Sequence, residues 1–470
     1  MKRSRFWPCV LGIGFLLLVG GAFYWQVWQR ETLAYHPLNP HVQHQRRVVK
    51  RGRIWGSHGE VIAESIEGLH GFRRVYLGTL SLAPITGYDS QRYGVAGLEK
   101  AYDSILMGRD YPGRSVLGIL GQGLTKRGVG YDVVTTIDMS MQRSVEMLLE
   151  GRKGAVIVME AKTGRILAAA STPGFSPNDI DAHWAVISTD GDSPLFNRAF
   201  AGFYPPGSTF KLVVLAAGLA SGKVVMESSF DDPGAISIHG YTITNSDGTD
   251  KRSLSLTEAL ALSSNVVFVR LAQEIGSDAI LDMARAFGLG QKPPLIGGSV
   301  GSGRIPTDEL TAVELAQMAI GQYNVAVSPL QMTLLVQALA NEGLMMRPTL
   351  VSAVHDPVSG KVWTNPPEPI RQVVKAGLAR KMREALAVTV QRGTGRQAAL
   401  PHVEIAGKTG SAENPQGVAH AWFVGMAPTA EPEICVTIIL ENAGSGGKVA
   451  APLAREIFRV YFNGIQGAKH

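Results

Sequence analysis

The fold of this chain is decided by the stretch Tyr204-Pro205-Pro206-Gly207-Ser208-Thr209-Phe210-Lys211. A proline-glycine turn here runs directly into an apolar, helix-forming segment, residues 212–220. Ser208 is therefore predicted to lie at the mouth of a helix, with Lys211 three residues later on the same face. A hydroxyl and an amine one helical turn apart can act as a nucleophile and its base.

The Ser-x-x-Lys pair alone is weak evidence for a catalytic site. Both residues are common, so the pattern is expected by chance about twice in a chain of this length. A second copy does occur, at Ser445-Gly446-Gly447-Lys448. It lies in a glycine-rich loop and is predicted to open no helix. Other elements must therefore single out the first copy.

Two later motifs can complete a site around Ser208. Ser263-Ser264-Asn265 stands in a polar break between two predicted helices, and Lys408-Thr409-Gly410-Ser411 stands at the end of a predicted strand. Each has a decoy copy: Ser176-Pro177-Asn178 is predicted to be a turn, and Lys162-Thr163-Gly164 to be the tip of a hairpin. The three motifs, taken in chain order, are thus predicted to lie at a helix start, between two helices and at a strand end, whereas the decoy copies are not.

Taken in order, these three motifs resemble those of the penicillin-binding proteins, specifically the monofunctional class B transpeptidases. The resemblance covers most of the chain. Further similar segments are Arg51-Gly52-Arg53-Ile54, residues 97–103, residues 154–175, Gln331, Gly393-Thr394-Gly395 and residues 420–425. Two departures concern the pedestal and a loop near the cleft: Gly56-Ser57 stands where many members have Asp-Arg, and Gly321-Gln322-Tyr323 where Gly-Gln-Gly is usual.

The resemblance implies catalytic roles for three side chains. Ser208 would be the nucleophile, Lys211 its base and Ser263 a relay for the proton that reaches the leaving amine. The backbone N–H groups of Ser208 and Ser411 would form the oxyanion hole. Lys211 can accept a proton only when neutral, whereas free lysine titrates near about 10.4. Burial and the charge of Lys408 are expected to lower its pKa.

The resemblance also implies a substrate-binding edge. Asn265 would hold the amide of the substrate peptide. Lys408, Thr409, Gly410 and Ser411 would form a cationic, donor-rich edge suited to a terminal carboxylate. The resemblance implies no metal and no organic cofactor, and the sequence lacks a His-Glu-x-x-His motif or a cysteine pair for zinc.

The predicted fold class is α+β. Residues 131–470 are expected to form a transpeptidase domain of the penicillin-binding and serine β-lactamase type, a five-stranded antiparallel sheet between helical layers. Two strands would precede a large helical insertion and three would follow it. Residues 29–130 would form a smaller mixed, strand-containing pedestal of the class B dimerisation type, and residues 1–28 a cytoplasmic tip and transmembrane anchor.

The N-terminal stretch predicts a membrane location. Lys2, Arg3 and Arg5 precede an uncharged stretch from Phe6 to Trp25, which is long enough to cross a bilayer. Basic residues before the span predict a single-pass protein of the bacterial cytoplasmic membrane, with its N-terminus inside and its catalytic domain outside. A cleaved signal peptide is the alternative.

Charge and cysteine content exclude some other classes. The net charge of +6 is spread along the chain and gives no clear nucleic-acid signature. The basic cluster at residues 46–53 is interpreted as a solvated strand edge, with an anionic surface as the alternative. Cys9 and Cys435 predict no disulfide, and Cys435 lies in an apolar run typical of a buried strand.

The sequence therefore predicts a peptidoglycan D,D-transpeptidase of bacterial cell-wall synthesis. Its substrates would be stem peptides ending in D-Ala-D-Ala, and β-lactams would be covalent inhibitors. The resemblance further implies a membrane-embedded SEDS-family glycosyltransferase as partner. Two alternatives stay open: a membrane-anchored serine β-lactamase or β-lactam sensor, and a catalytically silent scaffold for wall synthesis. A β-lactamase would need a way to activate water on the acyl-enzyme.

Overall fold

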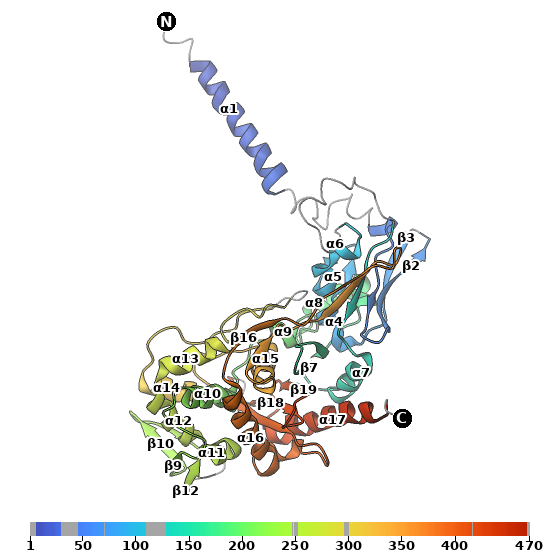
Figure 1. The fold of residues 1–470 in the computed structure, drawn as a ribbon. Coiled ribbons are helices and arrows are strands. Elements are labelled where there is room, and N and C mark those ends of the chain that lie inside the picture. The colour runs from blue at the N-terminus through green and yellow to red at the C-terminus, as the bar shows by residue number, and fades with distance from the viewer. Residues whose placement is uncertain are drawn as a thin grey trace.

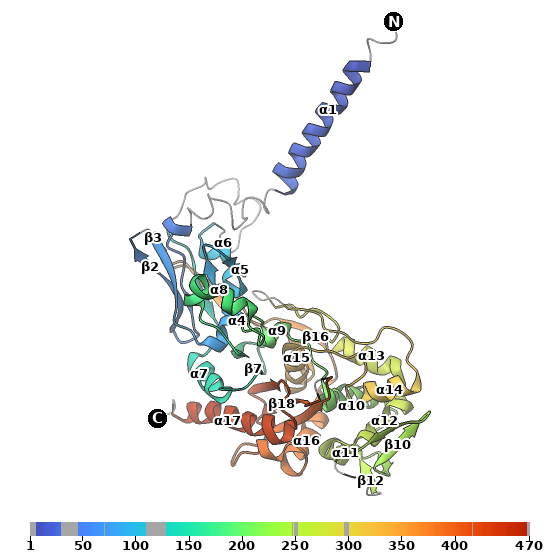
Figure 2. The same ribbon diagram turned by 180° about the vertical axis from the view of Figure 1, so that it is seen from behind.

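The computed structural model describes residues 6–29, 46–69, 71–109, 128–246, 248, 252–295, 300–415 and 417–467. Figures 1 and 2 show an N-terminal helix, a pedestal that contains β2 and β3, and a larger body. The body holds a central sheet and most of the helices, and it carries all three sequence motifs.

The body is built on a five-stranded antiparallel sheet, as predicted. Its strands are β7 (Gly154–Glu160), β8 (Ile166–Thr172), β17 (Ala406–Ala412), β18 (His420–Ala427) and β19 (Ile434–Leu440), in the order β17-β18-β19-β7-β8. β17 is one edge of this sheet, so part of its backbone has no neighbouring strand to pair with. A peptide can add to such an edge as a further strand.

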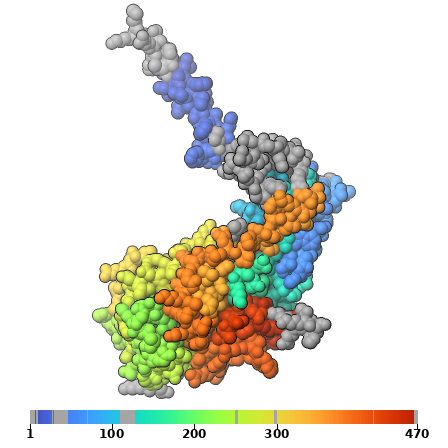
Figure 3. Space-filling view, viewed as in Figure 1, coloured from blue at the N-terminus to red at the C-terminus, as the bar shows by residue number. Residues whose placement is uncertain are grey.

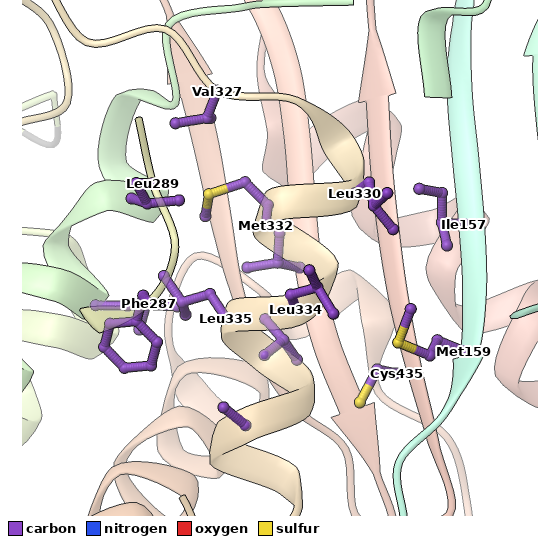
Figure 4. Close-up of a cluster of buried hydrophobic side chains, with 14 of the residues drawn as sticks. Ile157, Met159, Phe287, Leu289, Val327, Leu330, Met332, Leu334, Leu335 and Cys435 are labelled. Atoms are coloured by element: carbon purple, nitrogen blue, oxygen red, sulfur yellow. The ribbon is translucent and has the colours of Figure 1, made fainter. Parts of the chain in front are cut away.

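Helices cover both faces of the sheet. Ile157 lies in the same buried cluster as residues of α15 (Pro329–Ala340), whereas its neighbour Val158 lies in a second cluster with residues of α17 (Gly446–Gly467). The two-residue period of a strand causes this division. Figure 4 shows Leu330 of α15 facing Ile157 across the first cluster. The predicted sheet between helical layers is confirmed.

Most of the remaining helices lie between β8 and β17 or precede β7. They are α7 (Met139–Leu148), α8 (Ile180–Thr189), α9 (Arg198–Ala201), α10 (Lys211–Ala220), α11 (Leu256–Leu262), α12 (Asn265–Ile275), α13 (Ser277–Ala286), α14 (Ala312–Ala319) and α16 (Ala376–Arg392). Ser255 and Glu258 form a capping box at the start of α11, in which each side chain accepts from the other residue's backbone N–H.

Four short strands interrupt the predicted helical insertion. They are β9 (Ser229–Asp232), β10 (Ala235–Ile238), β11 (Tyr241–Thr244) and β12 (Arg252–Ser255), with β9 paired to β12 and β10 to β11. This part of the chain contributes to the green surface at one end of the body in Figure 3. Each strand has only four residues, too few for a two-residue alternation to be distinguished from a polar loop.

The pedestal contains a six-stranded sheet in the order β15-β14-β6-β1-β2-β3. Its strands are β1 (Ile54–Trp55), β2 (Val61–Gly68), β3 (Gly71–Tyr76), β6 (Asp132–Thr135), β14 (Val351–His355) and β15 (Val362–Thr364). The short helices α4 (Ala83–Thr86), α5 (Gly97–Ala101) and α6 (Asp103–Leu106) accompany it. β14 and β15 come from the segment between α15 and α16, so the body contributes strands to the pedestal sheet.

A buried ion cluster joins two segments of the pedestal that resemble class B motifs. Arg51 Nε lies 2.6 Å from Glu99 Oε2, and Arg74 Nε lies 2.7 Å from Glu99 Oε1. Burial alone lowers the pKa of Arg51, but the charges of Glu99, Asp89 and Asp103 outweigh it and raise that pKa. Burial also raises the pKa of Glu99, and the two arginines more than reverse this, so that carboxylate stays ionised.

The predicted transmembrane helix is not found. α1 covers Phe6–Phe23, and a short π-helical turn follows at Tyr24–Trp28. Among the residues that the structure describes, no helix is both long and apolar enough to cross a membrane.

Candidate active site

Ser208 lies in the tight turn that leads into α10. This turn, η5, is a 3-10 helix over Gly207–Phe210, and Lys211 begins α10. Gly207 has a φ of 53°, and a Cβ atom at this position would lie 2.8 Å from the backbone oxygen of Ser411. Glycine is therefore required where the turn meets β17. The first and third motifs are in direct contact, as predicted.

Lys211 connects the first motif to the second. Its side chain is fully buried, and Nζ donates to Ser263 O at 2.8 Å, to Asn265 Oδ1 at 2.7 Å and to Ser263 Oγ at 3.3 Å. An ammonium group has three N–H donors, and these oxygens are acceptors for them. As a neutral base, Lys211 would have one N–H donor fewer. Ser208 lies on the preceding turn, and a direct bond from its hydroxyl to Lys211 stays a prediction.

Ser263 joins the two lysines of the site. It ends α11 in the left-handed conformation, with a φ of 60°, and its side chain is buried. Lys408 Nζ donates to Ser263 Oγ at 2.9 Å, on the same oxygen that Lys211 approaches. A hydroxyl oxygen can accept both N–H bonds and keep its own proton to donate. This geometry suits a proton relay.

Lys408 is fully buried on β17, and its second bond goes to Thr409 O at 3.0 Å. Burial lowers the pKa of Lys408 from 10.5 to about 7. The sequence predicted a lowered pKa for Lys211, and that stays a prediction. For Lys408, which was expected to supply a positive charge, the structure adds a lowered pKa that the sequence did not predict.

The remaining predicted residues lie at the end of β17, where the strand packs against the turn at residues 206–207. Thr409 Oγ1 donates to Thr394 Oγ1 at 2.7 Å, and a Cβ atom at Gly410 would lie 2.9 Å from Pro206 O. Ser411 is exposed, and its Oγ accepts from Gly446 N at 3.2 Å. Because β17 is an edge strand, a peptide can lie along it next to Ser208.

Sequence reasoning missed a second group of polar residues behind the site. Asn265 Nδ2 donates to Thr244 O at 2.7 Å, and the backbone N–H of Asn265 donates to Asn245 Oδ1 at 2.8 Å. Asn245 in turn donates to Asp232. These residues lie in β9 and β11 or next to them, in the strands that the sequence did not predict. No motif marked them.

The loop before Ser208 is also fixed by polar contacts. Tyr204 Oη and Arg198 Nε both donate to Glu441 Oε1, at 2.7 and 2.9 Å. Trp422 Nε1 donates to Pro205 O at 3.0 Å. The unusual loop at Gly321-Gln322-Tyr323 lies beside the same turn, since Gly207 N donates to Gly321 O at 3.0 Å. That departure therefore leaves the turn at Ser208 supported.

The decoy copies of the second and third motifs are distinct from this site. Lys162-Thr163-Gly164 lies between β7 and β8, and Pro177–Asp179 is a short 3-10 turn, as predicted. The expectation for the second Ser-x-x-Lys copy is wrong, however: Ser445 directly precedes α17, which begins at Gly446. Helix opening alone thus does not separate the two copies. The contacts of Lys211 with Ser263 and Asn265 do.

Comparisons with known proteins agree with this arrangement. A family model described as the penicillin binding protein transpeptidase domain matches residues 154–459, and one described as the penicillin binding protein A dimerisation domain matches residues 51–117. The chain is 35% identical over 483 residues to peptidoglycan D,D-transpeptidase PbpA of Mycobacterium tuberculosis, with 96% of each chain covered. It is 30% identical to peptidoglycan D,D-transpeptidase MrdA of Acinetobacter baumannii, covering 88% of this chain and 67% of that one.

Solved structures give the same result. Penicillin-binding protein A from M. tuberculosis, in its imipenem acyl-enzyme complex, matches with a TM-score of 0.80 and 33% identity, over 89% of this chain and 99% of that one. The D,D-transpeptidase domain of a peptidoglycan glycosyltransferase from Eggerthella lenta matches with a TM-score of 0.80 and 31% identity, over 90% of this chain and 100% of that one.

Proposed function

This chain belongs to the class B penicillin-binding proteins and is a peptidoglycan D,D-transpeptidase, and we propose that its acyl-enzyme forms at Ser208. The donor is a stem peptide ending in D-Ala-D-Ala. The observation that best supports this proposal is that Lys211 and Lys408 both contact the buried hydroxyl of Ser263. That hydroxyl lies behind the turn that holds Ser208.

In the first step Ser208 Oγ attacks the carbonyl of the penultimate D-Ala. Lys211, as a neutral amine, takes the hydroxyl proton, and the backbone N–H groups of Ser208 and Ser411 stabilise the oxyanion. Collapse breaks the peptide bond. The terminal D-Ala leaves as an amine, with its proton delivered through Ser263. The product is an ester between Ser208 and the shortened stem peptide.

In the second step the amine of a neighbouring stem peptide attacks this ester. The amine loses a proton to the same base, the new amide bond forms, and Ser208 leaves with a proton restored to its oxygen. Asn265 holds the amide of the bound peptide throughout. Before the first step, the terminal carboxylate of the donor is held by Lys408, Thr409, Gly410 and Ser411, so that a peptide lying along the β17 edge has its scissile bond at Ser208.

The test uses a synthetic stem pentapeptide as donor and a D-amino acid as acceptor, with products followed by mass spectrometry. The wild-type chain is expected to release one D-Ala for each acylated donor and to form the exchange product. Ser208→Ala is expected to lose both activities. Ser445→Ala, in the other Ser-x-x-Lys copy, is the matched control and should keep them. Unchanged product formation by Ser208→Ala would reject the assignment.

We propose further that the enzyme works at the outer face of the bacterial cytoplasmic membrane, with its N-terminus inside. Support comes from the basic residues that precede α1 and from the apolar surface of that helix, on which Leu16, Leu17 and Leu18 are exposed. Water disfavours such a surface. Fractionation of cells expressing the chain with and without residues 1–28 tests this. Equal recovery of both forms in the soluble fraction would contradict it.

A SEDS-family glycosyltransferase is the partner that we propose. The match to a dimerisation domain at residues 51–117 supports a pedestal that binds another protein. A transpeptidase must act on newly polymerised glycan strands, which gives a reason for such pairing. Co-purification of the full chain with each candidate glycosyltransferase, compared with a chain lacking residues 46–109, tests the partnership. Equal recovery of the partner by both forms would contradict a pedestal interface.

A further inference from the structure

Asn245, in the turn after β11, acts as an external cap for α12. Its Oδ1 accepts from the backbone N–H groups of Asn265 at 2.8 Å and Val266 at 3.2 Å. The first N–H groups of a helix have no partner within the helix. The N-cap residue Ser264 satisfies only Val267, through its hydroxyl. The buried amide of Asn245 therefore completes the start of the helix that carries Asn265.

Asp232 fixes which way this amide points. Asn245 Nδ2 donates to both carboxylate oxygens of Asp232, at 2.8 and 2.9 Å. Burial raises the pKa of Asp232, but hydrogen bonds from Ser264, Gly234 and Asn245 and the charge of Arg252 more than reverse this and lower it. An ionised carboxylate only accepts hydrogen bonds. The NH₂ group must face Asp232, and Oδ1 must face α12.

The neighbouring residue orients the side chain of Asn265. Thr244 O accepts from Asn265 Nδ2 at 2.7 Å, which leaves Asn265 Oδ1 toward Lys211 Nζ, also at 2.7 Å. Two consecutive residues, 244 and 245, thus hold both the backbone and the side chain of the motif asparagine. Among the contacts that the structure describes, Thr244 and Asn245 are linked to Lys211 through Asn265.

We propose that Asp232 and Asn245 are positioning residues that hold Ser263 and Asn265 in register with Lys211. This rests on the proposed acyl-enzyme at Ser208. Neither residue is expected to touch substrate. A displacement of about 1 Å in a catalytic group can slow a reaction on the order of a hundredfold, so loss of the Asn245 amide is expected to slow acylation about ten- to hundredfold.

The experiment measures the second-order rate constant for labelling of the full chain by a fluorescent penicillin. Asn245→Ala is expected to show the slowing stated above. Asn341→Ala is the matched control: Asn341 follows α15, its Nδ2 also donates to a backbone oxygen, that of Leu344 at 3.0 Å, and it lies outside the site. It should label like the wild type. An Asn245→Ala variant that labels as fast as the wild type would overturn the proposal.

A pH profile separates positioning from general loosening of the fold. Asn245→Asp keeps the size of the side chain but sets a carboxylate against Asp232. Among the described residues, the charged groups facing this position are Asp232 on β9, Arg252 on β12 and, through Asn265, Lys211 on α10. As the pH falls, one of two adjacent carboxylates takes up a proton, and their repulsion is removed. The labelling rate of Asn245→Asp, relative to that of the wild type, should therefore rise as the pH is lowered from about 8 to about 5.5.

The exchanged pair, Asp232→Asn with Asn245→Asp, provides a rescue. The amide and carboxylate then trade places, so the double variant should label faster than Asn245→Asp at the higher pH and lose the pH dependence. A flat pH profile for Asn245→Asp, or no rescue in the double variant, would contradict positioning by this pair. If the wild type itself fails to label, the proposed function fails instead, and the two outcomes are distinguishable.

Discussion

The pedestal and the catalytic site each bury a cluster of cationic side chains, but they stabilise those cations differently. In the pedestal, Arg51 is paired directly with the carboxylate of Glu99 at 2.6 Å. In the site, the contacts described for Lys211 and Lys408 include the hydroxyl, carbonyl and amide oxygens of Ser263, Asn265 and Thr409. Both clusters are buried, and the site has a lysine with its pKa near 7.

The type of partner, a carboxylate or a neutral oxygen, decides whether the buried cation of each cluster can lose its proton. A buried arginine beside a carboxylate keeps its charge at any physiological pH, and breaking the pair leaves an uncompensated charge. A buried lysine held by neutral oxygens can lose its proton at little cost. The pedestal cluster is therefore a structural element, whereas the site can exchange protons. The predictions below test this division.

Lys211→Met should have the largest effect on activity. Removing the proposed base is expected to slow acylation by about 10³-fold or more, since general bases contribute on the order of 10²–10⁴. Methionine fills similar space without a buried charge, so the melting temperature should stay near that of the wild type. Penicillin labelling and thermal unfolding measure the two effects. Lys223→Met, at an exposed position just after α10, is the control and should change neither.

Arg51→Met should show the opposite pattern. Removing Arg51 leaves Glu99 with Arg74 as a partner and so compensates the buried carboxylate less well, and the free energy of unfolding is expected to fall by up to about 3–5 kcal/mol. The protein that stays folded should acylate at the wild-type rate. Arg53→Met is the comparison, because its pair with Glu64 is more exposed and is worth less than about 1 kcal/mol. Equal destabilisation by the two variants would undermine the division between the clusters.

The pH dependence of acylation should follow Lys408. Its protonated form attracts the carboxylate of the substrate, and its pKa is lowered to about 7 by burial. As the pH rises through that value the charge is lost, so kcat/KM, which reports the free enzyme, should fall up to about tenfold per pH unit. Lys408→Arg stays charged and should remove this alkaline decline, whatever its absolute rate. If kcat/KM of Lys408→Arg declined in the same way, the decline would have to come from another titrating group.

Tyr204→Phe should have the smallest effect. It removes the bond to Glu441 and leaves that carboxylate with Arg198, so a stability loss of about 1 kcal/mol is expected, with acylation slowed only a few-fold. The pair of Arg198 and Glu441, like the arginine–glutamate pairs of the pedestal, joins an arginine to a carboxylate, and it lies next to the turn that holds Ser208. Tyr461→Phe, whose bond to Glu433 is longer at 3.4 Å, is the control. A loss of acylation as large as that of Lys211→Met would give Tyr204 a catalytic role.

The sequence predicted the five-stranded sheet because its strands are continuous apolar runs, such as residues 434–440, and because the helical insertion separates them in order. It also predicted that Ser208, Ser263 and Lys408 meet, since three motifs of one family occurred together. It could not reveal that β14 and β15 complete the pedestal sheet. Such pairings join distant residues, for example Val354 with Val133, and leave no local pattern.

Two features of the site were also beyond the sequence. The pKa of a lysine depends on burial and on the groups around it, so the lowered pKa of Lys408 required coordinates. Asn245 and Asp232 lie in short polar strands and turns, where an asparagine and an aspartate are ordinary turn residues. Only their contacts with the start of α12 distinguish them.

The most direct test of the central claim is the mass of the protein after reaction with benzylpenicillin. We expect one added drug molecule per chain, located on the peptide that contains Ser208 and released only slowly, with no addition to Ser208→Ala. The same addition to Ser208→Ala, or rapid turnover of the drug without a lasting adduct, would contradict a transpeptidase that acts through Ser208.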